Sequence, residues 1–130
     1  MTTPNPATEN LLQGLRVLVV EDESLVAMLI EEYLIDLGCV VAGSARRVAK
    51  GLETVSQCEI DTAVLDVNVA GESVSPVAEL LDKRGIPFIF ASGYGAKGVE
   101  ARWADRPVLQ KPFSPDDLRL ALLASLRSPS

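Results

Sequence analysis

Five polar side chains stand where short apolar segments of this 130-residue chain end. Glu21 and Asp22 follow the first such segment, Asp66 ends a second, Ser92 follows a third, and Lys111 follows a fourth. If these segments are parallel strands, their carboxyl ends meet at one edge of a sheet, where open α/β sheets bind ligands. Three carboxylates, one hydroxyl and one amine would then share a single site.

The chemistry of such a site follows from its charges. Clustered carboxylates repel one another, so they either raise a proton affinity or bind a cation. The chain contains no histidine, and an all-oxygen donor set suits a hard ion such as Mg²⁺ or Mn²⁺. A lysine and a hydroxyl beside that ion favour phosphoryl chemistry, with Asp66 as the attacking group. Lys111 and the metal would neutralise the phosphoryl oxygens, and Ser92 would donate to one of them.

The segments that position these residues alternate between strand and helix patterns. Apolar, β-branched runs predict strands over residues 15–20, 39–43, 61–68, 86–91 and 108–110. Apolar residues at spacings of three and four predict helices over about 24–37, 48–55, 75–84, 99–105 and 114–126. This alternation predicts an α/β, flavodoxin-like (βα)5 three-layer sandwich. Its five-stranded parallel sheet is expected in the order 2-1-3-4-5, with right-handed crossovers.

Local signals mark where several of these helices begin. Ser24, Ser75 and Ser114 are predicted to be N-caps, the last two followed by Pro at the first helical position. Residues 69–72 are predicted to form a loop. Residues 93–98 are glycine-rich and are expected to be mobile, and the helix over 99–105 that follows them is expected to be short and marginal.

Bulk composition sets the class of protein. The chain is 48% apolar and 23% charged, which is typical of one globular domain, and we expect that domain over 14–127 with a flexible tail over 1–13 and no output domain. A net charge of −6 argues against a broad nucleic-acid-binding face. Cys39 and Cys58 lie in or beside apolar segments and are expected to be buried thiols. With no long apolar span and no signal-peptide pattern, the cytoplasm is the expected compartment.

Jointly, these residues resemble the receiver domain of bacterial response regulators, the phospho-acceptor family of two-component signalling. The resemblance extends from Arg16 to about Leu126 and includes the Lys111-Pro112 pair. It implies that Asp66 accepts a phosphoryl group from the phosphohistidine of a sensor histidine kinase or a phosphotransfer protein. Such a protein is a signalling switch, not a conventional enzyme, although it catalyses its own phosphorylation and dephosphorylation.

The resemblance also implies a ligand set. Asp22 and Asp66 would hold Mg²⁺ directly, Glu21 would hold it through a water molecule, and Asn68 would contribute its backbone carbonyl. The peptide bond between Lys111 and Pro112 would be cis.

Residues 90–95 (Phe-Ala-Ser-Gly-Tyr-Gly) resemble the motif of a narrower branch, the FAT GUY receivers, with Ser92 in place of Thr. Members of that branch are mostly single-domain regulators. One position departs from the wider family, which usually has an aromatic residue where this chain has Val108. An aromatic rotamer switch cannot operate there, so we hypothesise that Tyr94 takes part in the switch together with Ser92.

Several alternatives remain open at this point. The chain could be a phosphate sink or shuttle instead of a signalling output, or an interaction module that no longer uses phosphate, for which Val108 is the only support. A flavodoxin-like cofactor binder is disfavoured, because residues 21–23 (Glu-Asp-Glu) would repel a phosphate. Leu120 and Leu123 lie off the expected buried stripe of the last helix. They are either ordinary surface residues or part of a partner-binding patch.

Overall fold

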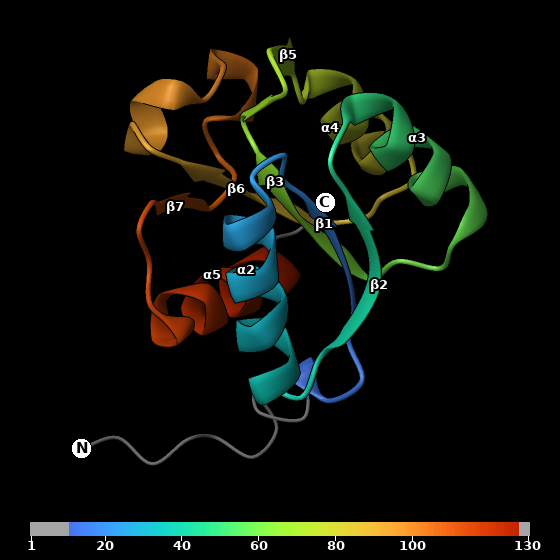
Figure 1. Cartoon of the computed structure of the whole chain (residues 1–130), viewed down its shortest axis with the longest axis vertical. Helices are drawn as coiled ribbons and strands as arrows, with labels where there is room; N and C mark the ends of the chain where they lie inside the picture. The colour runs from blue at the N-terminus through green and yellow to red at the C-terminus, as the bar shows by residue number, and fades with distance from the viewer. Residues whose placement is uncertain (1–10, 128–130) are drawn as a thin grey trace.

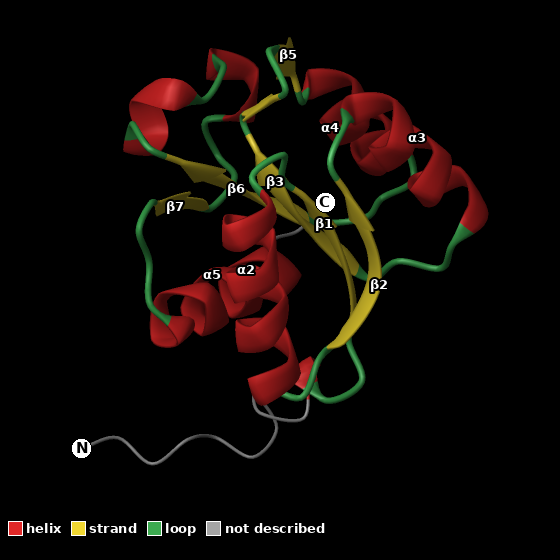
Figure 2. Ribbon diagram, viewed as in Figure 1, coloured by secondary structure: helices red, strands yellow, loops and turns green. Residues whose placement is uncertain are grey.

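The computed structural model describes residues 11–127 as a parallel sheet covered by helices on both faces (Figures 1 and 2). The sheet has five strands in the order β2-β1-β3-β6-β7, which is the predicted order once a small separate hairpin, β4–β5, is left out of the numbering. In chain order the elements are β1 (Arg16–Val20), α2 (Ser24–Asp36), β2 (Val40–Ala45), α3 (Val48–Gln57), β3 (Thr62–Asp66), β4 (Asn68–Val69), β5 (Glu72–Ser73), α4 (Ser75–Lys83), β6 (Phe88–Ser92), the 3₁₀ turns η1 (Gly95–Gly98) and η2 (Ala101–Trp103), β7 (Val108–Gln110) and α5 (Pro115–Arg127).

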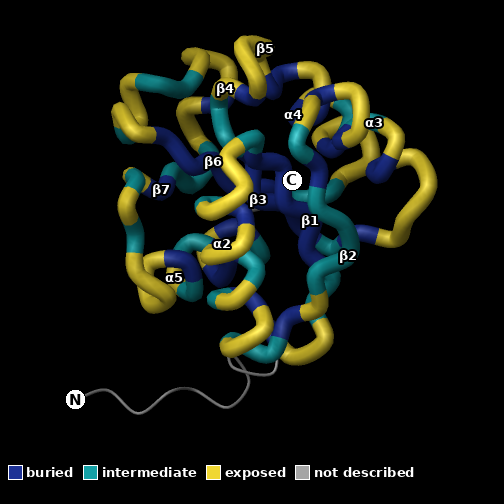
Figure 3. The backbone as a smooth tube through the Cα atoms, in the orientation of Figure 1, coloured by how far each residue is buried: buried dark blue, intermediate teal, exposed yellow. Residues whose placement is uncertain are grey.

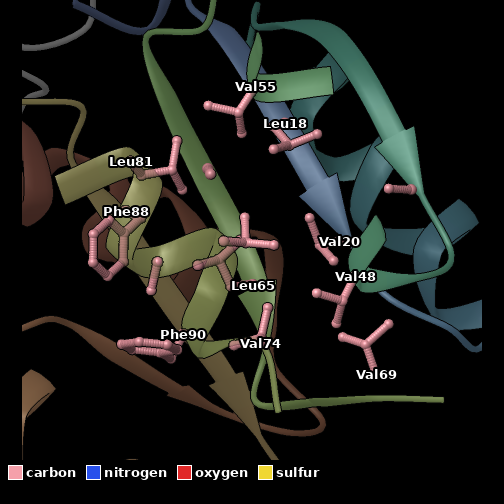
Figure 4. Packing of buried hydrophobic residues seen from close by; sticks show 14 of the residues in the cluster. Leu18, Val20, Val48, Val55, Leu65, Val69, Val74, Leu81, Phe88 and Phe90 are labelled. Atoms are coloured by element: carbon pink, nitrogen blue, oxygen red, sulfur yellow. The ribbon is translucent and has the colours of Figure 1, made fainter. Parts of the chain in front are cut away.

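Side-chain alternation along the strands divides the core into two layers. Leu18 and Val20 of β1 pack with Leu65 and Phe90 beneath α3 and α4 (Figure 4). Val17 and Val19 point to the other face, where α2 and α5 cover them. Because both faces of the sheet are buried, the strands are continuous apolar runs, and the predicted three-layer sandwich is confirmed.

The segment after β3 is a hairpin and not the predicted loop. Asn68 pairs with Ser73 and Val69 with Glu72 in antiparallel register. The two-residue turn between them has positive φ at both positions, 53° at Ala70 and 84° at Gly71, as tight primed turns require. Val69 anchors the hairpin, since its side chain is fully buried in the core layer under α3 and α4 (Figure 4).

Two of the three predicted N-caps are wrong. The caps of α2 and α4 are Glu23 and Val74, and neither makes a side-chain capping bond. Ser75 is already helical, and its N–H donates to Ser73 Oγ at 3.2 Å. Ser114 is the cap of α5 as predicted.

The bonds at Ser114 form a reciprocal capping box. Its Oγ accepts from the Asp117 N–H at 3.1 Å, and its own N–H donates to Asp117 Oδ2 at 3.0 Å. The sequence signal is strong here because Pro115 and the acidic residues of the first turn reinforce the serine.

The predicted helix over 99–105 is also wrong. Extended backbone at Val99 and Glu100 separates the two short turns η1 and η2. Tertiary packing explains this break, because Trp103 is buried with its ring edge-on to Phe88 at 5.5 Å between centroids. The Arg106 guanidinium lies 4.5 Å from the centre of the same Phe88 ring and adds a cation–π contact to this packing.

Two leucines depart from their predicted faces. Leu29 of α2 is one of the apolar residues whose spacing predicts the buried stripe of the helix over 24–37, but it is 45% exposed. Leu123 of α5 is only 3% exposed. Together with Leu118 and Leu122 it belongs to the core layer between the sheet and the helices α2 and α5, so it cannot contribute to a surface patch. Of the two leucines proposed for such a patch, only Leu120 is exposed.

The remaining differences concern the cysteines and the amino-terminal boundary. Cys39 is buried as expected, whereas Cys58 is exposed at the end of α3. Most of the expected tail lies outside the described residues, but Leu12, within its last three residues, is buried against the α2–α5 layer. Within residues 11–127, no helix combines the length and the apolar character needed to cross a bilayer.

Candidate functional site

Strand register brings the predicted site residues to one edge of the sheet. Asp66 is the last residue of β3 and pairs with Ala91, the neighbour of Ser92 in β6. Ser92 in turn pairs with Gln110, which precedes Lys111. Glu21 and Asp22 follow β1, whose last residue pairs with Leu65.

Lys111 joins the two carboxylates of this site that come from β1 and β3. Its Nζ donates to Glu21 Oε1 at 2.6 Å and lies 3.4 Å from Asp66 Oδ2. Glu21 is 1% exposed, and its other oxygen accepts from the Glu23 N–H at 3.0 Å. A buried carboxylate needs such partners, so Glu21 holds the lysine in place as much as the lysine neutralises it. The Lys111–Pro112 peptide bond is cis, as the resemblance implied.

Three carboxylates lie close enough to share one ion. Ligand oxygens of Glu21, Asp22 and Asp66 all fall within 4.8 Å of one another. The donor set contains only hard oxygens and carries more negative charge than Lys111 can balance. These residues therefore fit Mg²⁺ or Mn²⁺, which prefer carboxylate oxygens and retained waters.

The pKa values of the cluster reflect this excess of negative charge. Burial and the adjacent charge of Glu21 raise the pKa of Asp66 to about 7, although Lys111 acts in the opposite direction. Burial would also raise the pKa of Asp22, but N–H groups, including that of Ala70, outweigh burial and lower it. Burial lowers the pKa of Lys111, yet its bonds to Glu21 and Asp66 dominate and raise it. Lys111 thus stays charged while Asp66 holds a proton near neutrality.

Ser92 lies at the edge of the acidic site, but its hydroxyl contacts the backbone of Tyr94 instead of the carboxylates. Its side chain is 3% exposed, and its Oγ accepts a hydrogen bond from the Tyr94 N–H at 3.0 Å. The Lys111 backbone N–H donates to the Ser92 carbonyl at 2.9 Å, whereas within residues 11–127 no hydrogen bond joins the Ser92 hydroxyl to Asp66 or Lys111. Tyr94 contacts Ser92 through its backbone N–H, and the residue itself is 82% exposed.

The two remaining predicted positions flank the site. Asn68 follows Asp66 by two residues in β4, and its backbone N–H stabilises the charged form of Asp66. Its own side chain is exposed. Val108 of β7 is half-buried and packs against the core layer beneath α3 and α4.

Sequence reasoning missed two residues near the site. Ala70 supplies an N–H to Asp22 from its positive-φ turn, and Gly98 of η1 lies against the Ser92 hydroxyl. The Ala70-Gly71 dipeptide carried a weak turn signal, whereas nothing in the local sequence distinguishes Gly98 from Gly93 or Gly95.

The raised pKa of Asp66 predicts that metal-free protein loses stability as pH rises. An unfolded Asp titrates near pH 4, so between about pH 4 and about pH 7 the folded state holds a proton that the unfolded state has released. The free energy of unfolding should therefore fall by about 2 kcal/mol from about pH 5 to about pH 8. Urea unfolding in a chelator would measure this change.

Asp66→Asn is the variant that isolates this effect, because it removes the titrating group and should flatten the profile. Asp61→Asn is the matched control, because Asp61 immediately precedes the same strand at its opposite end. Asp61 pairs with Arg16, which lowers its pKa, so that variant should be less stable by a constant amount at neutral and alkaline pH and should change the slope of the profile only at acidic pH. An alkaline stability loss that survives in Asp66→Asn would contradict the assignment.

Comparison with known proteins agrees with this geometry. The response regulator receiver domain model matches residues 17–123. A curated relative, the transcriptional regulatory protein PdtaR of Mycobacterium tuberculosis, is 28% identical over 107 residues, which cover 79% of this chain and 52% of PdtaR. The chain thus spans about half the length of the curated relatives it matches.

Solved structures show the same fold. The solution structure of SdrG from Sphingomonas melonis Fr1 superposes with a TM-score of 0.80 at 46% identity, covering 87% of this chain and 97% of SdrG. A BeF3-activated conformation of SdrG gives a TM-score of 0.74 at 46% identity, over 87% and 96% of the two chains. The PhyR receiver domain of Erythrobacter litoralis gives 0.77 at 26% identity, over 92% and 98%. The chain belongs to the response regulator receiver domain family.

Proposed function

We propose that this receiver accepts a phosphoryl group on Asp66 from the phosphohistidine of a partner protein and signals through protein–protein contacts. The observation that carries the proposal is the position of Lys111, whose Nζ lies within 3.4 Å of Asp66 and is held there by buried Glu21. A fixed ammonium beside an acidic residue at the carboxyl edge of a sheet suits a phosphoryl group on that residue.

The transfer is a substitution at phosphorus. One oxygen of Asp66 forms the new O–P bond, the bond between phosphorus and the donor imidazole nitrogen breaks, and that nitrogen keeps the electron pair. Mg²⁺ held by Asp22 and Asp66, with Glu21 through water and the Asn68 carbonyl, would supply positive charge against the phosphoryl oxygens. Lys111 binds one of these oxygens and Ser92 donates to another. Water later hydrolyses the acyl phosphate and restores the carboxylate.

The test is phosphorylation by a small acyl phosphate, read by intact-protein mass or by mobility on a phosphate-binding gel. We expect labelling with Mg²⁺ and none with a chelator. BeF3⁻ with Mg²⁺ should also shift thermal unfolding upward, as a ligand of the folded state does. If neither reagent acts on the wild-type chain, the proposal fails and the interaction-module alternative gains support.

The exposed face of α2 supports a protein as the donor. Leu25 and Met28, three and six residues after Asp22, are 80% and 53% exposed, and the tube of α2 is exposed along much of its outer side (Figure 3). Exposed large apolar side chains this close to a site are typical of a protein-binding surface. A groove of about 330 Å³ lies along the same helix, lined by Val26, Tyr33, Phe113 and others, and it reaches Lys111. The helical face is bordered by acidic residues, which favours a partner helix whose apolar stripe has a basic rim.

Replacing Leu25 and Met28 together by Glu should therefore separate the two kinds of donor. Transfer from a phosphohistidine protein that labels the wild-type chain should slow about tenfold or more, because buried interface anchors are lost. Labelling by the small acyl phosphate should not change. Ile35→Glu, at the opposite end of the same helix face, is the matched control and should have a smaller effect. Equal loss with both donors would show damage to the site and not to docking.

A further inference from the structure

The Ser92 hydroxyl is held on the side of η1. Its Oγ accepts from the Tyr94 N–H at 3.0 Å, and residue 92 is only 3% exposed. A hydroxyl this deeply buried cannot turn to water, so it must find a polar partner within the protein. Ser92 also lies beside the acidic site, because its neighbour Ala91 pairs directly with Asp66.

The Ser92 hydroxyl can occupy this position because Gly98 has no side chain. A Cβ added at Gly98 would approach Ser92 Oγ well inside the 3.0 Å that real Cβ atoms keep from other atoms. Its next contacts, to the Cβ atoms of Ser92 and Tyr94, would be 3.4 Å and 3.6 Å, which are acceptable or nearly so. Gly98 is not among the residues with positive φ, so its backbone would accept an alanine. Only the hydroxyl of Ser92 requires a glycine there.

We propose that Gly98 is a positioning residue that keeps the Ser92 hydroxyl directed toward η1 until the site is phosphorylated. The inference rests on the proposed function, in which Ser92 donates to the phosphoryl group on Asp66. A methyl group at position 98 removes the resting position of the hydroxyl. The hydroxyl then turns toward the site, which biases the protein toward its phosphorylated state before any ligand binds.

The test measures BeF3⁻ affinity in the presence of Mg²⁺ by calorimetry. Gly98→Ala should bind about three- to tenfold more tightly than wild type, because the hydrogen bond from Tyr94 no longer competes. In a Ser92→Ala background the same substitution should have no effect, since the atom it displaces is gone. Gly93→Ala is the matched control, because its added Cβ meets nothing within 4 Å although it stiffens the same loop.

A stability cycle over the same four proteins, namely wild type, the two single variants and the double variant, tests the contact without any ligand. Gly98→Ala should lower the unfolding midpoint when Ser92 is present and leave it nearly unchanged when residue 92 is alanine. If Gly98→Ala alone does not fold, the double variant should restore folding.

Three outcomes would overturn the inference. They are unchanged or weaker BeF3⁻ binding by Gly98→Ala, a gain that persists in the Ser92→Ala background, and an equal gain in Gly93→Ala. If wild type itself does not bind BeF3⁻, the proposed function fails, and the stability cycle still decides whether Gly98 acts through Ser92.

Discussion

Asp66→Asn is expected to abolish phosphorylation by a small acyl phosphate, with at least a hundredfold loss of labelling rate. The amide has no anionic oxygen with which to attack phosphorus, and the three-carboxylate cluster loses one of its members. The fold should survive, because the isosteric amide also relieves the repulsion from Glu21 that raises the pKa of Asp66. Labelling followed by mass analysis of peptides measures the rate and the modified residue together.

Asp61→Asn is the matched control for this loss. Asp61 precedes the same strand at its opposite end and pairs with Arg16, far from the site, so its replacement should leave labelling intact. Labelling of Asp66→Asn at the wild-type rate, or a labelled peptide that lacks residue 66, would sink the acceptor assignment.

Lys111→Met should have the second largest effect, on stability as well as on phosphorylation. Methionine has a similar length but no charge, so Glu21, which is 1% exposed, loses its closest cation, although it keeps the hydrogen bond from the Glu23 N–H. Leaving one member of a buried pair alone costs about 3 kcal/mol in general, and we expect about 2 kcal/mol here because Lys111 is 21% exposed. Urea unfolding at neutral pH measures the loss.

Glu21→Gln combined with Lys111→Met distinguishes a lost charge pair from damaged packing. The double variant leaves no unpaired buried charge, so it should be more stable than Lys111→Met alone. Lys111→Arg should retain most of the stability but phosphorylate slowly, since a planar guanidinium cannot replace a compact ammonium between two carboxylates. If all three variants have the same stability, Glu21 does not depend on Lys111.

The sequence was sufficient for the architecture and for the acidic part of the site. Each strand is an apolar run of a few residues that ends beside a polar one. In a parallel sheet the carboxyl ends of the strands share one edge, so the topology brings Asp66 and Lys111 together. The ion pair between Lys111 and Glu21 follows from that topology and from the need of a buried carboxylate for a partner. The roles of these residues in phosphoryl transfer and metal binding remain predictions.

What the sequence could not predict depends on contacts between distant segments. Val99 to Asp105 has helical spacing, but packing of Trp103 on Phe88 breaks the segment into two turns. Ser75 has the signature of a cap, but it is already helical, and its N–H donates to Ser73 Oγ of the preceding hairpin. The direction of the Ser92 hydroxyl depends on Gly98, six residues away, which no local pattern marks.

The environment of Trp103 gives this protein a built-in optical probe. It is the only tryptophan in the chain and is only 7% exposed. Its indole N–H has no hydrogen-bond partner among the described residues. Its ring lies against Phe88, on the strand that ends at Ser92, and 4.9 Å from the Arg102 guanidinium. Emission from an indole shifts with local polarity and with nearby charge, so any displacement of η2 changes the spectrum of the unlabelled protein.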